Sequence, residues 1–107
     1  MAGGSWEGLA IESLIAAAPS GTEAHFFRTA AGAEIDLLLK LPGQRKPWAI
    51  EIKRGLVPKL ERSFDLACDT VHPQRRLVLY GGLERFPLGE GMEAVSLTDL
   101  CVELSAA

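Results

Sequence analysis

The sequence predicts a single α/β domain in which helices pack on a central mixed sheet. Its 107 residues, 48% of them hydrophobic, suffice for one core and one domain. The spacing of apolar residues changes along the chain between a helical and an extended period, in the order helix, three strands, helix, strand, a further short strand and helix. A strand–helix–strand passage in the second half is typical of a parallel neighbour being added to a sheet.

The first half of the chain is expected to contain one helix and three strands. Apolar residues from Trp6 to Ala18 follow a helical period, and Pro19-Ser20-Gly21 ends that helix. Strand-like stretches follow, separated by turn residues, and three consecutive strands favour an antiparallel meander. These stretches are Ala24–Thr29, Ala33–Leu41 and Trp48–Lys53.

The second half begins with a predicted helix from Pro58 to Thr70, because proline suits a first turn and Leu60 and Phe64 start an apolar stripe. A buried strand is expected at Leu77–Tyr80, before a loop rich in proline and glycine. A last strand and a closing helix complete the domain. The loop holds Pro87, Gly89 and Gly91, the strand is Ala94–Ser96, and Thr98 caps the helix that turns Leu100, Cys101 and Leu104 inward.

The period of two in the strands assigns their side chains to faces. In the second strand it groups the apolar residues on one face and the acids on the other, and the third strand divides in the same way. The two apolar faces are expected to pack under a helix as the main core. They comprise Ile35, Leu37 and Leu39 on one strand and Trp48, Ile50 and Ile52 on the next; Glu34, Asp36 and Leu38 share the opposite face with Ala49, Glu51 and Lys53.

Charged residues stand where this pattern expects apolar ones. Glu7 shares a helical stripe with Ile11 and Leu14, although a first-turn glutamate is also favoured by the helix dipole. Asp36 lies in a strand interior, where aspartate is disfavoured. Glu51 and Lys53 are neighbours on one strand face, an arrangement that a simple salt bridge would also explain. Carboxylates gathered this closely repel one another unless a cation shares the site.

A hard divalent cation meets that requirement. Mg²⁺ or Mn²⁺ binds through one or two carboxylates and needs neither histidine nor cysteine. Lys53 would add a positive charge beside the bound anion, which suits metal-assisted cleavage of a phosphodiester. We therefore expect Glu7, Asp36, Glu51 and Lys53 to converge on one pocket at an edge of the sheet.

Asp36, fourteen intervening residues and then Glu51-Ile52-Lys53 resemble the signature of the PD-(D/E)XK nuclease superfamily. That resemblance implies a restriction-endonuclease-like α-β-β-β-α-β core. It implies Asp36 and Glu51 as metal ligands, Lys53 as the catalytic lysine and Glu7 as a helix acid assisting the metal.

More narrowly, the chain resembles the DUF4143 domain found at the C-terminus of bacterial and archaeal AAA-type ATPases. The motifs that carry this resemblance are Trp6-Glu7, Phe27-Arg28-Thr29, Gly32-Ala33-Glu34-Ile35-Asp36 and Ala49-Ile50-Glu51-Ile52-Lys53. A phosphate-binding Gly-x-x-x-x-Gly-Lys-Ser/Thr motif is absent from the sequence. The resemblance therefore implies a C-terminal fragment of a larger ATPase or a stand-alone remnant, with the ATPase domain on the same chain or on a partner chain.

Two functions follow as hypotheses. The first is a Mg²⁺-dependent nuclease-like domain that hydrolyses phosphodiesters of DNA. The second is a catalytically inactive copy of the fold that serves as an interaction or regulatory module of an ATPase. Retention of all four charged residues favours the first, whereas the small size and acidic remainder favour the second.

Charge bears on the choice of partner. Seven basic and two acidic residues lie between Lys40 and Arg62, around the predicted site in the sequence, and the rest of the chain has a net charge of −8. Such a cluster suits phosphate binding, and it equally suits a solvated hairpin tip and helix face. A pI near 5.3 argues against tight nonspecific DNA binding by the domain alone, so a partner domain or a homodimer would supply the rest.

Other classes of site and location receive little support. The two cysteines, Cys68 and Cys101, fall on apolar stripes as buried thiols rather than a disulfide, and neither they nor the histidines have the spacing of a zinc site. Neither a membrane-spanning stretch nor a secretory signal is recognisable, so we expect a cytoplasmic location and no membrane partner.

Overall fold

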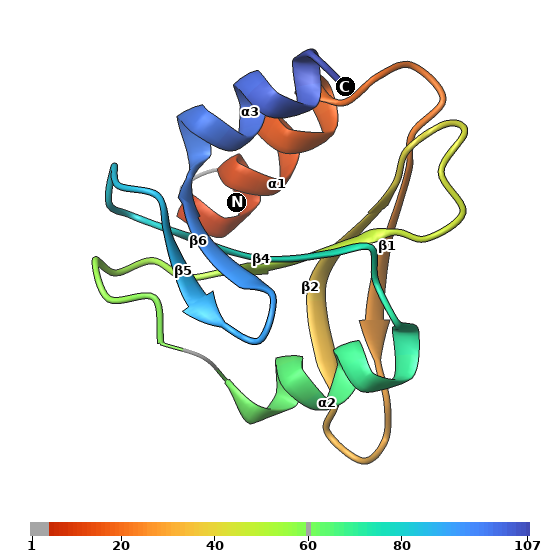
Figure 1. Cartoon of the computed structure of the whole chain (residues 1–107), viewed down its shortest axis with the longest axis vertical. Helices are drawn as coiled ribbons and strands as arrows, with labels where there is room; N and C mark the ends of the chain where they lie inside the picture. Colours follow the sequence, from red (N-terminus) through yellow and green to blue (C-terminus); the bar gives the residue numbers. More distant parts are fainter. Residues whose placement is uncertain (1–4, 60) are drawn as a thin grey trace.

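A computed structural model describes residues 5–59 and 61–107, which form a six-stranded sheet with helices on both faces (Figure 1). The α/β fold class predicted from the sequence is confirmed. The elements are α1 (Trp6–Ala17), β1 (Glu23–Arg28), β2 (Glu34–Lys40), β3 (Trp48–Ile52), α2 (Arg62–Val71), β4 (Arg75–Tyr80), β5 (Phe86–Gly89), β6 (Met92–Ser96) and α3 (Leu97–Ser105).

The strand order in the sheet is β1-β2-β3-β4-β6-β5. The first three strands form the expected antiparallel meander, and β4 and β6 then add to β3 in parallel. The sheet is therefore mixed, because α2 and the β5 hairpin carry the chain over between parallel neighbours.

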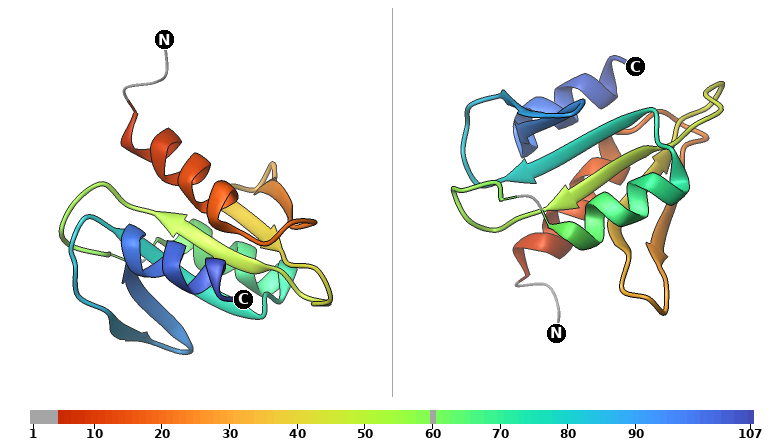
Figure 2. Two further views of the ribbon diagram at one scale, coloured as in Figure 1. Left: turned by 90° about the horizontal axis from the view of Figure 1, so that it is seen from above. Right: turned by 60° about the horizontal axis from the view of Figure 1, so that its bottom comes forward.

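Helices α1 and α3 lie side by side on one face of the sheet and α2 covers the other (Figures 1 and 2). The β3 residues that were predicted to pack under a helix lie beneath α1 and α3. Leu37 and Leu39 of β2 lie beside them. This core comprises chiefly Ala10, Leu14, Leu37, Leu39, Trp48, Ile50, Ile52, Leu77, Leu79, Leu100 and Leu104. A second core under α2 comprises Ala33, Ile35, Leu38, Ala49, Phe64, Ala67, Cys68 and Met92.

Ile35 packs on the opposite face from the one that strict alternation predicts. The register between β1 and β2 slips between the pairs His25–Leu38 and Phe27–Ile35, so Phe26 faces two residues of β2, Asp36 and Leu37. This bulge adds one residue to β2 and exchanges the faces on either side of it. Ile35 consequently joins the core under α2, whereas Leu37 joins the core under α1 and α3.

Helix α2 begins four residues later than predicted, at Arg62 rather than Pro58. Main-chain hydrogen bonds from Lys53 N to Leu79 O and from Gly81 N to Gly55 O, each 2.8 Å long, keep the chain after β3 extended alongside β4. Pro58 therefore lies in a loop, although a proline is also compatible with the first turn of a helix. Leu60, predicted on the apolar stripe, lies outside the described residues.

The segment predicted as a loop around Pro87 contains strand β5, which pairs antiparallel with β6. Because β5 is at an edge of the sheet, the missing N–H of Pro87 is tolerated there. Positive φ angles of 96° at Gly89, 50° at Glu90 and 78° at Gly91 turn the chain back into β6. The two glycines thus mark a hairpin rather than an open loop.

The closing helix α3 is capped by Ser96 rather than by the predicted Thr98. Ser96 Oγ accepts a hydrogen bond of 3.1 Å from the backbone N–H of Asp99, as an N-cap serine does. Leu100 and Leu104 face inward as predicted, whereas Cys101 is only partly buried. None of the helices within the described ranges is both long and apolar enough to span a bilayer.

Candidate functional site

The candidate site lies where β2 and β3 separate. Their ladder pairs end with Leu37 opposite Ile50. Beyond that pair, the backbone N–H of Ile52 donates a 2.8 Å hydrogen bond to Asp36 Oδ2 instead of to a strand carbonyl. The bulge and this bond hold the Asp36 carboxylate in the gap between the two strands, within reach of both faces of the sheet.

Glu51 is buried next to this gap, with 6% of its surface exposed. Alternation along β3 turns it toward the same face as Ala49, which packs under α2. Burial is the largest cause that raises the pKa of Glu51, to about 7, and the charge of Asp36 and a hydrogen bond with it act in the same direction. Lys53 lowers the pKa but does not cancel these effects. The Asp36 and Glu51 carboxyl groups are therefore close neighbours at the junction of β2 and β3.

Lys53 binds two carboxylates. Its Nζ lies 3.3 Å from Glu51 Oε2 and 3.0 Å from Glu61 Oε2. Desolvation lowers the pKa of Lys53, but the hydrogen bond with Glu61 and the charge of Glu51 outweigh it and leave the pKa raised. Glu61, in the N-cap position of α2, was not among the predicted site residues, because the helix was expected to begin before it.

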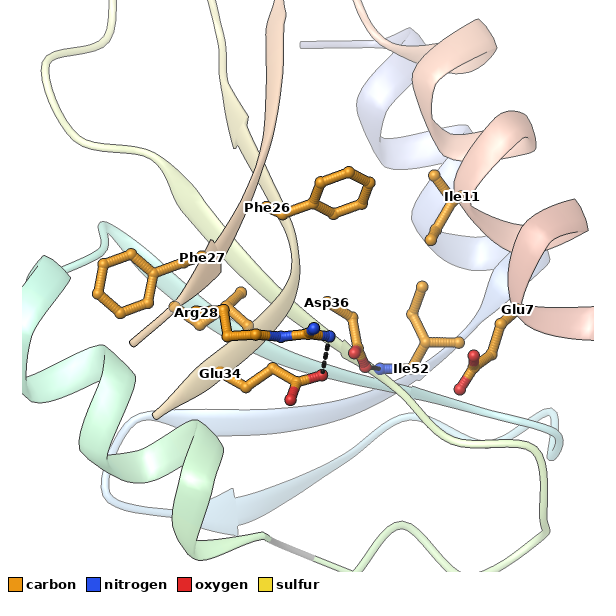
Figure 3. Close-up of a pocket in the computed structure, with 9 residues that line it drawn as sticks. Glu7, Ile11, Phe26, Phe27, Arg28, Glu34, Asp36 and Ile52 are labelled. Carbon is orange, nitrogen blue, oxygen red and sulfur yellow. Dashed lines mark hydrogen bonds and ion pairs between the residues drawn. The ribbon is translucent and has the colours of Figure 1, made fainter. Parts of the chain in front are cut away.

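A pocket of about 480 Å³ opens on the other side of Asp36, between α1, β1 and the end of β3 (Figure 3). Its floor and walls combine apolar with charged side chains. The apolar ones are Ile11, Phe26, Phe27, Ile35 and Ile52, and the charged ones are Glu7, Arg28, Glu34 and Asp36.

Glu7 extends into this pocket from the first turn of α1 (Figure 3). It is exposed, and α1 buries Ala10 and Leu14 instead, so Glu7 does not enter the helix–sheet core as its stripe suggested. Glu7 and Asp36 thus line one pocket, whereas Glu51 lies near Asp36 on the side of α2 and Lys53 pairs with Glu51 there.

The predicted ligand set Asp36, Glu51 and Glu7 does not close into one cluster. In residues 5–59 and 61–107, no three His, Cys, Asp or Glu side chains are grouped closely enough to hold a metal ion. The pair Asp36–Glu51 is the part of the predicted set that the fold brings together.

The basic segment is divided by the fold. Lys40, Arg45 and Lys46 lie at the turn between β2 and β3, at the opposite end of β3 from Glu51. The basic residues after β3, such as Lys53 and Arg54, follow the strand end that carries the carboxylates. Only this half of the segment lies at the site end of the sheet, so the interpretation that the whole segment surrounds the site is corrected.

Comparison with known proteins assigns the chain at the level of a family. A family model described as a domain of unknown function, DUF4143, matches residues 2–100. The chain belongs to the DUF4143 family. The match includes both acids of the pair, Lys53, and the pocket residues from α1 and β1.

Two curated relatives of this DUF4143 domain are uncharacterized proteins of Mycobacterium bovis and Mycobacterium tuberculosis. Each is 38% identical over 93 residues, which is 87% of this chain and 20% of the relative. The chain thus spans about a fifth of the length of these relatives. No solved structure matches it significantly.

The shifted pKa of Glu51 predicts a pH-dependent stability that Glu51→Gln removes. Because its pKa in the folded chain is about 7 against an ordinary 4.5, the unfolded chain loses this proton first as the pH rises. The stabilising contribution is complete below pH 4.5 and is lost by about pH 7, amounting to about 3 kcal/mol at most.

Urea unfolding in EDTA at pH 5 and pH 8 measures this contribution. The stability of Glu51→Gln relative to wild type should rise between the two pH values, since glutamine carries no charge to bury. Glu12→Gln, on the exposed side of α1, is the matched control and should follow wild type at both pH values. Parallel behaviour of Glu51→Gln and wild type would contradict the assignment of a raised pKa to Glu51.

Proposed function

We propose that this DUF4143 domain is a Mg²⁺-dependent nuclease that hydrolyses phosphodiester bonds of DNA, with Asp36 and Glu51 as its cation-binding pair. The observation that carries the proposal is the placement of two acids at one junction of neighbouring strands: Asp36 accepts a hydrogen bond from the N–H of Ile52, and the preceding residue, Glu51, is buried. Two acids close together at a desolvated position are unfavourable when both are ionised, and a divalent cation removes that penalty.

The residues present fit such a cation. Mg²⁺ and Mn²⁺ prefer oxygen ligands, and Mg²⁺ typically binds through one or two carboxylates while keeping several waters. A pair rather than a cage of acids matches that preference. When bound, the cation would supply an acidified water and neutralise charge on the phosphate.

The chain's own residues have separate tasks in this proposal. Asp36 is fixed in orientation by the N–H of Ile52, so its carboxylate needs no reorganisation when a cation binds. Glu51 is the second ligand. Lys53, held beside Glu51 at 3.3 Å, stabilises the negative charge that develops on the phosphate. The resemblance to PD-(D/E)XK nucleases supports the same three roles.

The alternative is a catalytically inactive module that associates with an AAA-type ATPase, on the same chain or on a partner. One observation favours it: the Lys53 ammonium lies closer to Glu61 than to Glu51, at 3.0 Å against 3.3 Å, and is thereby neutralised. In this reading Lys53 joins the end of β3 to the start of α2 and has no substrate. Under either function we propose a cytoplasmic location and a homodimer.

The experiment is calorimetric titration of Mg²⁺ and Mn²⁺ into wild type, Asp36→Ala and Asp36→Asn, with cleavage of plasmid DNA assayed in Mn²⁺ and in EDTA. Both variants should lose divalent-ion binding and cleavage, because each removes a ligand charge. Asp36→Asn keeps an oxygen to accept the Ile52 N–H, so it separates ligand loss from unfolding.

Asp69→Ala is the control, since Asp69 is exposed on α2 and its substitution removes the same charge as Asp36→Ala. It should bind and cleave as wild type does. Wild-type protein that binds no divalent ion and cleaves no DNA would contradict the nuclease and support the interaction module.

A further inference from the structure

We propose that the pocket beside Asp36 binds one unpaired nucleobase bearing an amino group, which makes single-stranded DNA the substrate class of the nuclease. This inference rests on the function proposed above. Three side chains that line the pocket carry it, and all three are exposed: Phe26, Arg28 and Glu7.

Phe26 supplies a stacking surface. It is 78% exposed on β1, an edge strand, and its ring extends over the pocket toward Ile11 of α1 (Figure 3). The bulge in β2 is opposite Phe26, so the strand partner of this residue is displaced at the pocket. Exposed aromatic rings of this kind bind the faces of unstacked bases in single-strand binding proteins.

Arg28 supplies a phosphate contact beside that surface. It follows Phe26 by two residues and therefore projects from the same face of β1. Its guanidinium pairs with Glu34 at 3.5 Å, with 76% and 43% of the two side chains exposed. So long and exposed an ion pair is weak, and a phosphate with bidentate geometry competes well for the guanidinium.

Glu7 determines which part of a nucleotide enters. The carboxylates of Glu7, Glu34 and Asp36 line the pocket and repel a phosphate from its interior. A carboxylate accepts hydrogen bonds from the amino group of a base, as acidic side chains do from cytosine N4. The base therefore enters edge-first toward Glu7, stacks on Phe26, and leaves its phosphate outside near Arg28.

The size of the pocket is consistent with this occupant. A volume of about 480 Å³ lies within the usual range of small-ligand sites. It has room for a single base, and the proposal does not require room for a base pair. Asp36 belongs both to the pocket and to the cation-binding pair, so a strand whose base is held here passes close to the proposed nuclease centre.

The test compares two labelled single strands of equal length, oligodeoxycytidylate and oligothymidylate, by fluorescence anisotropy at pH 8 in EDTA. Both pyrimidines stack alike, but only cytosine offers an amino group, so wild type should bind oligodeoxycytidylate several-fold more tightly. Phe26→Ala should weaken binding of both strands about fivefold or more, the lower end of the loss of one stacked base.

Glu7→Gln should abolish the difference between the two strands, because an amide donates to thymine O4 as readily as it accepts from cytosine N4. A purely structural role of Glu7 would leave the ratio of affinities unchanged. Glu12→Gln on the same helix and Leu83→Ala, 83% exposed in the loop between β4 and β5 and not among the pocket residues, are the matched controls and should bind as wild type does.

Equal affinities of wild type for the two strands, or wild-type binding by Phe26→Ala, would overturn the base site. Metal-dependent cleavage of duplex DNA without any such selectivity overturns the base site and keeps the nuclease. Selective binding that Glu7→Gln abolishes, with no cleavage of either strand in Mn²⁺, keeps the base site and overturns the nuclease.

Discussion

Lys53→Ala should lower DNA cleavage by about 100-fold or more while divalent-ion binding stays nearly intact. Lysine is not a metal ligand, so its loss does not remove the cation. Its charge stabilises the negative charge that develops on the phosphate, and loss of one such group lowers the rate by about two to three orders of magnitude. Single-turnover cleavage in Mn²⁺ and calorimetric titration of the same protein measure the two effects separately.

Lys59→Ala is the control, because Lys59 is an exposed lysine in the loop that follows the same strand. It should cleave at the wild-type rate. If Lys53 serves only to neutralise Glu51, its loss would instead destabilise the fold by several kcal/mol, since a buried carboxylate would lose a partner. Unfolding curves of Lys53→Ala at pH 8 distinguish this result from a loss of chemistry.

Trp48→Ala should lower the free energy of unfolding by about 3 to 5 kcal/mol, as expected for truncation of a buried aromatic side chain. Trp48 is 4% exposed in the core beneath α1 and α3, and its Nε1 donates a 2.9 Å hydrogen bond to Gln44. The Arg75 guanidinium lies 4.8 Å from the ring centroid, so the substitution also removes a cation–π contact.

Urea unfolding monitored by circular dichroism measures this loss. Val102→Ala, 65% exposed on α3, is the control and should change the stability by no more than about 0.5 kcal/mol. An unchanged unfolding midpoint in Trp48→Ala would mean that this face of β3 does not form the core.

Most of the fold could be predicted from the sequence because its strongest signals are local. The run Trp48–Ile52 is apolar except for Glu51 and is buried along its whole length, and each helix has apolar residues that pack into a core. The first strands form a meander through short turns, so their order needs little long-range information. The exceptions were β5 and the start of α2. Pro87 lies in a strand although proline is typical of a loop, and Pro58 lies in a loop although proline is typical of a first helical turn.

The candidate site was predicted less completely, for a physical reason. The period of two assigns faces only while the register continues, and the bulge at Asp36 and Leu37 interrupts it. No residue type at this point of β2 indicates the extra residue of a bulge, because the bulge depends on pairing with β1. The proximity of Asp36 and Glu51 follows from strand order, whereas the separate pocket and the pairing of Lys53 with Glu61 depend on tertiary packing.

The hydrogen bond from Ile52 N–H to Asp36 has a consequence for how this family evolves. The carboxylate takes the place of a strand carbonyl, so the sheet needs an oxygen at position 36 whether or not the domain retains any chemistry. Selection for folding alone would preserve aspartate or asparagine there and reject alanine or valine. A lineage that abandoned the cation should therefore drift to asparagine first, and aspartate at this position by itself does not distinguish an active descendant from a silent one.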